Sequence, residues 1–352
     1  MFTMNLFFRG LLTNIEPPDE RLRAAKEIPA NVRDFLKEAV GLVTASPHTR
    51  LAGSYARTTA IGDIKDVDII VIVDSDIYRD APKRALRALR DTLADFPAYL
   101  SDAGGAELRP RRRSVHVYFQ RRDFHLDVVP AIVPNGIDEP LYVPDREWEE
   151  WIPSHPLGYG EFLSRINGDN SQKVVPLMKL FKHWRDVHMT YKRPKSYWLE
   201  SIIVRHIHQG WVETEGKAYA EIVLALMDSV YGRFEHELDE GGVPEVPDPM
   251  LGSNVARNWK RDHFEAFMGR LDESRGWAAR ALEADTQNEA IRLWKKVFGE
   301  QFPDDVEGSA KSLADSLAGG FAVTASGMIS TRPGGVRSVR PRPHTFHGES
   351  KA

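Results

Sequence analysis

The order of apolar and polar residues predicts helices and strands in alternation over about the first 150 residues. Apolar residues recur at helical spacing between residues 22 and 40, directly after the acidic pair Asp19-Glu20, which favours a helix start. Pro29 lies inside this run and is expected to break or kink the helix. Residues 67–73 are a nearly continuous β-branched run, which is typical of a strand buried on both faces.

Further elements follow from the same patterns. A strand over 50–54 leads into a Gly-Ser turn, a helix covers 82–96, and two strands occupy 114–120 and 124–129. After about residue 150 helical spacing dominates, and the predicted helices there are 171–188, 197–208, 217–238, 255–282 and 287–298.

These patterns divide the chain into three parts. We predict a mixed α/β lobe with N-terminal helices over 1–155, a helical lobe over 156–307, and a disordered tail over 308–352. The tail is rich in glycine and basic residues and poor in bulky apolar ones, so it offers little surface to bury. The fold class expected is α+β, with a mixed sheet in the first lobe.

Composition excludes several classes of protein. The chain has no cysteine, which rules out disulfide scaffolds, zinc–thiolate sites and cysteine nucleophiles. Its formal net charge is −4, which argues against a constitutive nucleic-acid coat. The longest apolar run, around residues 69–73, is strand-sized and far shorter than the ~18 residues of a membrane span. The first ten residues lack the pattern of a signal peptide. We expect a folded cytoplasmic protein with no membrane association.

Asp66 and Asp68 are the first candidates for chemistry. They lie two residues apart at the start of a predicted strand, so both point to one face while Val67 and Ile69 point to the other. Two carboxylates beside a buried strand repel each other and lose solvation, and a cation offsets both effects. Mg²⁺ takes oxygen ligands and keeps positions open for phosphate oxygens. The pair therefore indicates a platform for a divalent cation.

A third carboxylate, Asp127, lies within an apolar strand, where an acid needs a partner or a metal. Three carboxylates can hold two metal ions ~3.5–4 Å apart, a spacing suited to in-line phosphoryl displacement. Upstream, Gly53 permits close backbone approach, and Ser54 offers a hydroxyl for phosphate oxygens. The alternative for Asp127 is an ion pair with an arginine of the run 109–113, and Gly-Ser or Asp-x-Asp alone is commonplace. Their conjunction favours the metal site.

The same residues carry a resemblance. Gly53-Ser54, eleven further residues, Asp66-Val67-Asp68 and then Asp127 resemble the catalytic signature of the polymerase-β-like nucleotidyltransferases. More narrowly, Gly-Ser-Tyr-Ala-Arg at 53–57 and Leu-Asp-Val-Val-Pro-Ala at 126–131 resemble the bacterial cGAS/DncV-like nucleotidyltransferases of CBASS anti-phage systems, which are related to 2′-5′-oligoadenylate synthetase. Thr58 departs from many relatives, which carry a small glycine there.

The resemblance extends into the second lobe and implies roles for particular residues. Asp66, Asp68 and Asp127 would be the catalytic residues and the ligands of two Mg²⁺ ions, with Mn²⁺ as a substitute. Gly53 and Ser54 would contact the donor triphosphate. Lys182 and Ser196 match positions that hold phosphates, and Tyr197 matches an aromatic residue that stacks on the donor base.

Plainer interpretations stand beside these roles. Lys182 can belong to a solvated helix face, and Tyr197 can be core. For His116 and His125, which lie on strands, we favour histidines satisfied within the sheet over ligands.

The function implied is template-independent, metal-dependent synthesis of a cyclic or linear oligonucleotide second messenger from nucleoside triphosphates. The alternatives are a nucleotidyltransferase that modifies tRNA or protein, and a non-catalytic nucleotide-binding module. The resemblance also implies a downstream effector that responds to the product. It further implies accessory proteins acting on the tail that ends in Gly348-Glu349-Ser350-Lys351-Ala352.

Overall fold

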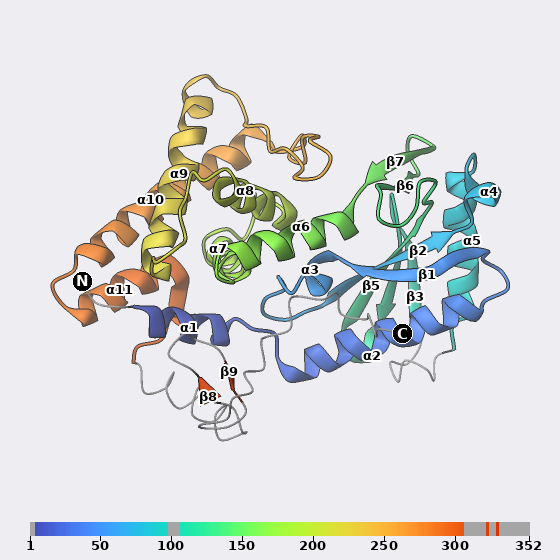
Figure 1. The fold of residues 1–352 in the computed structure, drawn as a ribbon, viewed down its shortest axis with the longest axis horizontal. Coiled ribbons are helices and arrows are strands. Elements are labelled where there is room, and N and C mark those ends of the chain that lie inside the picture. Colours follow the sequence, from blue (N-terminus) through green and yellow to red (C-terminus); the bar gives the residue numbers. More distant parts are fainter. Residues whose placement is uncertain (1–3, 98–105, 306–321, 324–328, 331–352) are drawn as a thin grey trace. The chain divides into compact units, whose positions relative to one another are not determined.

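A mixed five-stranded sheet holds the segments that carry the three aspartates, as the computed structural model shows (Figure 1). The structure describes residues 4–97, 106–305, 322–323 and 329–330. The chain forms two compact units, one of residues 17–163 and the other of residues 4–16 together with 164–305. The predicted combination of a mixed sheet with a helical lobe is confirmed.

The sheet belongs to the first unit and has the strand order β1-β2-β5-β4-β3. The neighbouring strands β2 and β5 are parallel, whereas the other neighbouring pairs are antiparallel. The strands are β1 (Thr44–Ala52), β2 (Asp66–Val73), β5 (Phe124–Ala131), β4 (Val115–Phe119) and β3 (Ala106–Pro110). Because β2 and β5 run side by side in the same direction, residues at their starts meet at one edge of the sheet.

The two faces of β2 have different coverings, and this explains its apolar sequence. On one face Val67, Ile69, Val71 and Val73 join a core shared with helices α2 (Asp19–Glu38) and α5 (Pro82–Ala94). On the other face Ile70 and Ile72 pack with residues of β6 (Leu141–Asp145), which pairs with β7 (Glu150–Ser154). Alternation places Asp66 and Asp68 on this second face, at the end of the strand that precedes the apolar pair.

Short elements complete the first unit: α3 (Gly53–Ala56), α4 (Ser75–Tyr78) and the 3₁₀ turn η2 (Gln120–Arg122). The second unit is helical, with α7 (Val174–His188), α8 (Ser196–His208), α9 (Tyr219–Asp239), α10 (Arg261–Glu283), α11 (Gln287–Phe298) and the 3₁₀ turn η3 (Gly299–Gln301). Helix α6 (Pro156–Asp169) begins in the first unit and ends in the second.

The N-terminal helix α1 (Asn5–Asn14) packs within the helical unit. The ring of Phe8 lies edge-on to Trp294, with centroids 4.9 Å apart, and to Phe298, at 5.7 Å. The sequence pattern instead placed this helix with residues 1–155. The contacts that decide its position are aromatic and nearly the whole chain length apart, so periodicity near the N-terminus does not report them.

Several elements differ from the sequence-based expectation. Helix α2 continues through Pro29, because Ile28 and Val32 are buried against the sheet and tertiary packing outweighs the ~3 kcal/mol that an interior proline costs. Helix α10 begins at Arg261 rather than near residue 255, and β1 begins earlier than predicted, at Thr44. Strands β3, β6 and β7 and helix α6 were not predicted.

The predicted tail, 308–352, lies outside the described residues apart from the antiparallel pair β8 (Ala322–Val323) and β9 (Ile329–Ser330). Within the described part of the chain, no helix has the length and apolar character needed to cross a membrane.

Candidate active site

Asp68 and Asp127 occupy facing positions on the two parallel strands of the sheet. The register of β2 against β5 pairs Asp68 with Asp127 and Asp66 with His125. Paired residues on adjacent strands point to the same face. The structure therefore brings three predicted residues, Asp66, Asp68 and Asp127, to one face at the start of two neighbouring strands.

Asp68 is the carboxylate most affected by these surroundings. Its pKa is raised to about 6, chiefly by burial and also by the nearby charges of Asp127 and Asp66, while the guanidinium of Arg57 acts in the opposite direction. The guanidinium carbon of Arg57 in turn lies 5.1 Å from the centre of the Tyr159 ring. Positive charge near Asp68 therefore offsets only part of the cost of holding a carboxylate at this position.

Gly53 lies directly against Asp68. Its φ of +73° is in the left-handed region, and a Cβ atom added there would lie 1.8 Å from Oδ2 of Asp68. A glycine is required both by the backbone angle and by this close approach. Ser54 follows Gly53 in α3, immediately after β1, so the predicted Gly-Ser turn lies beside the aspartates.

Asp127 is held by three side chains from the segment that leads into β4 and from β4 itself. Ser114 Oγ donates a hydrogen bond to Oδ1 over 3.0 Å, and His116 Nδ1 lies 3.3 Å from the same oxygen. Arg111 Nε forms an ion pair with Oδ1 at 3.7 Å. The alternative interpretations from sequence, an arginine partner and a satisfied histidine, both describe real contacts of Asp127. Sequence analysis did not find Ser114, since its position depends on the pairing of β4 with β5.

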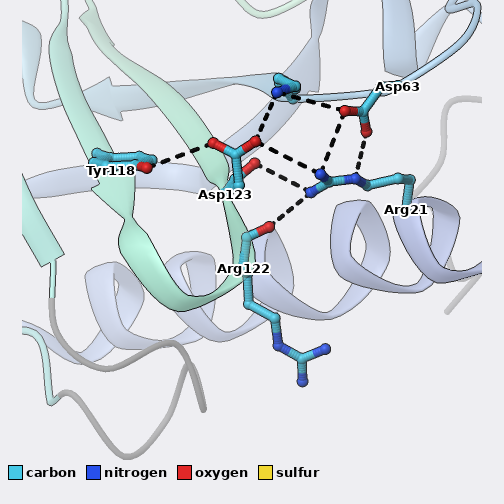
Figure 2. Close-up of polar contacts among 6 residues, drawn as sticks. Arg21, Asp63, Tyr118, Arg122 and Asp123 are labelled. Carbon is cyan, nitrogen blue, oxygen red and sulfur yellow. Dashed lines mark hydrogen bonds and ion pairs between the residues drawn. The ribbon is translucent and has the colours of Figure 1, made fainter.

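The starts of β2 and β5 are joined by charged side chains around Arg21 of α2 (Figure 2). Arg21 forms an ion pair with Asp63 and donates hydrogen bonds to the carbonyl oxygens of Arg122 (2.6 Å) and Asp123 (3.1 Å). Lys65 Nζ lies 2.6 Å from Oδ2 of Asp123. These residues, which we call the Arg21 network, tie the loop before Asp66 to the turn before Asp127.

The predicted residues of the helical unit form a separate group of contacts. Lys182 and Glu200 are both buried and form an ion pair between α7 and α8. Ser196 Oγ accepts a hydrogen bond from Arg185 at 3.0 Å. The hydroxyl of Tyr197 donates to Oδ2 of Asp248 at 3.0 Å. Lys182 is therefore not on a solvated face, and Tyr197 is half-buried rather than core.

Sequence analysis missed Arg185 and Glu200, the two charged side chains that contact Lys182 and Ser196. Both residues are charged yet fall on the apolar side of a predicted helix, among residues that are buried in the structure. A charged residue at such a position is rarely buried without a partner, and this could have identified both from the sequence.

The carboxylates fit a divalent cation by their chemistry. Mg²⁺ and Mn²⁺ prefer oxygen ligands, which these carboxylates provide. The raised pKa of Asp68 beside two further carboxylates shows that a cation bound here would stabilise the ionised side chains. In the described ranges, no group of three or more His, Asp or Glu side chains is already arranged as a metal cage. The donors therefore fit a site that is completed by other oxygen ligands, such as phosphate oxygens.

Comparison with known proteins adds independent information. Residues 1–167 match the family described as the Second Messenger Oligonucleotide or Dinucleotide Synthetase domain. The chain is 30% identical over 346 residues to a cyclic AMP-AMP-AMP synthase of an Acinetobacter species, covering 93% of this chain and 96% of that protein.

Two solved structures have similar folds. The CD-NTase CdnG of Bradyrhizobium diazoefficiens, in complex with GTP, has a TM-score of 0.64 at 16% identity, with 88% of this chain and 97% of that chain covered. CdnC of E. coli MS115-1, in a complex with HORMA-deltaN, has a TM-score of 0.60 at 19% identity, with 82% and 94% covered.

Proposed function

Because the chain belongs to the family of second messenger oligonucleotide or dinucleotide synthetases, we propose that Asp66, Asp68 and Asp127 form its catalytic metal site. This family consists of nucleotidyltransferases that make cyclic oligonucleotide second messengers, and its members depend on a metal ion. The family predicted from the sequence is confirmed, and with it the enzymatic function.

The observation that carries the proposed site is the parallel register of β2 and β5. It places Asp68 beside Asp127 with Asp66 on the same face. When bound there, two Mg²⁺ ions, or Mn²⁺ in their place, would favour ionisation of an attacking hydroxyl and neutralise triphosphate charge. The three carboxylates would hold them.

The remaining steps belong to the chain's own residues. Asp127 accepts the proton of a 2′ or 3′ hydroxyl as its oxygen bonds to the α-phosphorus of the donor nucleotide. The bond from that phosphorus to the β-phosphate oxygen breaks, and pyrophosphate leaves. The backbone at Gly53 and the hydroxyl of Ser54 contact the departing phosphates, since both lie beside the aspartates.

The helical unit supplies the proposed contacts to the rest of the nucleotide. Ser196 and Lys182 contact phosphates, and Tyr197 stacks on the donor base. Lys182 must then exchange part of its ion pair with Glu200 for a phosphate contact. Arg185, which donates to Ser196, orients that hydroxyl.

We propose ATP as a substrate, because the Acinetobacter relative is named for a product built of three AMP units. The test incubates the purified protein with each nucleoside triphosphate and with all four, in Mg²⁺ or Mn²⁺, and identifies products by mass spectrometry. We expect a cyclic oligonucleotide containing adenylate. The control is the double variant Asp66→Asn/Asp68→Asn, which should fold and form no product. Product formed by that variant would overturn the assigned site.

We also propose that an accessory protein acts on residues 308–352. The support is that the E. coli neighbour was solved in complex with HORMA-deltaN. Co-expression of full-length and tail-deleted chains with proteins encoded beside the gene tests this. A partner that modifies or retains both forms equally would contradict the role of the tail.

A further inference from the structure

The two carboxylate oxygens of Asp127 differ in their contacts with the surrounding side chains. Within the described residues, the hydrogen bonds and the ion pair of Asp127 all reach Oδ1, from Ser114, His116 and Arg111. Oδ2 receives none of them. The carboxylate is thus fixed through one oxygen, and the other remains for a ligand.

The two nearest donors are well placed to fix it. Ser114 and His116 are only 6% and 5% exposed, and hydrogen bonds in such surroundings are little weakened by water. Ser114 is positioned by a turn in which the Arg111 amide donates to its carbonyl oxygen at 2.9 Å. His116 is the direct partner of Asp127 in the register of β4 against β5. Arg111 is more exposed and farther away, so it adds charge rather than orientation.

The tautomer of His116 follows from its neighbours. An ionised carboxylate only accepts hydrogen bonds, so Nδ1 of His116 carries the hydrogen that faces Asp127. In this tautomer Nε2 of His116 accepts from Nδ1 of His125, which lies 2.9 Å away. The ring of His125 is itself stacked on Tyr118, with centroids 4.5 Å apart. Donation therefore runs in one direction, from His125 through His116 to Asp127.

We propose that Ser114 and His116 are positioning residues: they hold Oδ1 of Asp127 so that Oδ2 is presented to the catalytic divalent cation, with His125 fixing the tautomer of His116. This inference rests on the proposed metal site. Partners of metal ligands typically change metal affinity by roughly 10–100-fold when they are removed, which sets the size of the expected effect.

The experiment measures Mn²⁺ binding to the full-length protein by electron paramagnetic resonance of free Mn²⁺. It is done in the presence of α,β-methylene ATP, which binds but cannot transfer its nucleotidyl group. We expect Ser114→Ala and His116→Gln each to raise the Kd for Mn²⁺ by roughly 10-fold or more. His116→Asn should restore a Kd near that of the wild type, because its amide nitrogen takes the place of Nδ1, whereas that of glutamine takes the place of Nε2.

Two controls separate this inference from its basis. His48→Gln alters another histidine of the same sheet, whose Nδ1 pairs with Thr44 Oγ1 at 2.8 Å, and should leave the Kd unchanged. Asp127→Asn should lose Mn²⁺ binding. Wild-type binding by Asp127→Asn would overturn the proposed metal site itself. Loss in Asp127→Asn with unchanged Kd in Ser114→Ala and His116→Gln would overturn only the positioning role.

Folding is monitored by the melting temperature of each variant. If His116→Gln does not fold, Ser114→Ala decides the question, since it is a small change in the segment that leads into β4. A Kd for Ser114→Ala equal to that of the wild type would then count against the inference.

Discussion

Asp68 and Asp127 are paired across two parallel strands, but their surroundings differ. Asp127 has donors from Ser114, His116 and Arg111, whereas Asp68 is half-buried against Gly53 with its pKa raised to about 6. The pair therefore combines one carboxylate that is fixed by hydrogen bonds with one that gains most from a cation. This difference leads to the first prediction.

Asp68→Asn should stabilise the metal-free protein at neutral pH. The pKa of Asp68 is raised in the folded state, so the folded form holds its proton longer than the unfolded form as pH rises. Stability is lost between about pH 4 and pH 6 and the loss is complete above that range, amounting to roughly 3 kcal/mol for a shift of this size.

Melting temperatures of wild type and Asp68→Asn, in a metal chelator, check this at about pH 4 and pH 7.5. The melting temperature of Asp68→Asn should exceed that of the wild type at the higher pH and nearly equal it at the lower. Asp76→Asn serves as the control, because that side chain is 94% exposed. An equal gain at both pH values would contradict the burial of an ionised Asp68.

Gly53→Ala should abolish most of the activity while leaving a folded protein. The new Cβ would meet Oδ2 of Asp68 at 1.8 Å, so the carboxylate must move away from its position. Misplacement of about 1 Å at a reacting centre can cost roughly 100-fold in rate. Gly210→Ala is the matched control, since its φ of +68° imposes the same backbone strain with no atom within 4 Å of the new Cβ.

Both variants should lose a similar ~1–2 kcal/mol of stability from the left-handed backbone angle. Only Gly53→Ala should lose product formation at saturating nucleotide. Equal rates in the two variants would show that the approach of Gly53 to Asp68 has no part in catalysis.

Lys182→Ala should destabilise the helical unit, because it leaves the buried carboxylate of Glu200 without its partner. Breaking a buried ion pair from one side costs roughly 3–5 kcal/mol. The double variant Lys182→Met/Glu200→Leu removes both charges and should recover most of that loss. Lys179→Ala, on the same helix but paired with a more exposed Glu16, should have little effect.

The double variant also isolates the phosphate contact, since it folds without either charge. Equilibrium binding of ATP should be weaker than in the wild type by roughly 10-fold or more, the value of a hydrogen bond to a charged group. Unchanged binding would restrict Lys182 to a structural role in the α7–α8 pair.

Tyr197→Ala and Tyr197→Phe should have different effects on ATP binding. Stacking of a base on an aromatic ring is worth ~1–3 kcal/mol, and only the alanine variant loses it. The phenylalanine variant loses the hydrogen bond to Asp248 and keeps the ring. If Tyr197→Phe weakens binding as much as Tyr197→Ala, the hydroxyl rather than the ring is the feature that matters.

Local sequence patterns predicted what depends on neighbours along the chain. The β-branched run at 67–73 correctly predicted a buried strand, and α11 begins and ends at the predicted residues 287 and 298. Asp66 and Asp68 were found because their spacing is local, and Asp127 because it is an acid within an apolar strand. An arginine partner from the run 109–113 was predicted for Asp127, but the contacts of Ser114 and His116 were not, because these two reach it through strand pairing that no periodicity encodes.

The same limit explains Lys182 and the N-terminal helix. A lysine on an amphipathic helix has the same pattern whether water or a buried glutamate faces it, and only the position of Glu200 on the next helix decides. Phe8 is placed by Trp294 and Phe298, which follow almost at the end of the described chain.

The Arg21 network makes the segments before Asp66 and Asp127 sensitive to ionic strength. Its acidic members, Asp63 and Asp123, keep 44% and 46% of their side chains exposed, so dissolved ions compete directly for these pairs. The buried core of the sheet has no such sensitivity. Ionic strength should therefore loosen the loop before Asp66 and the turn before Asp127 together, at salt concentrations that leave the strands themselves intact. An Arg21→Ala variant should therefore behave at low salt as the wild type does at high salt.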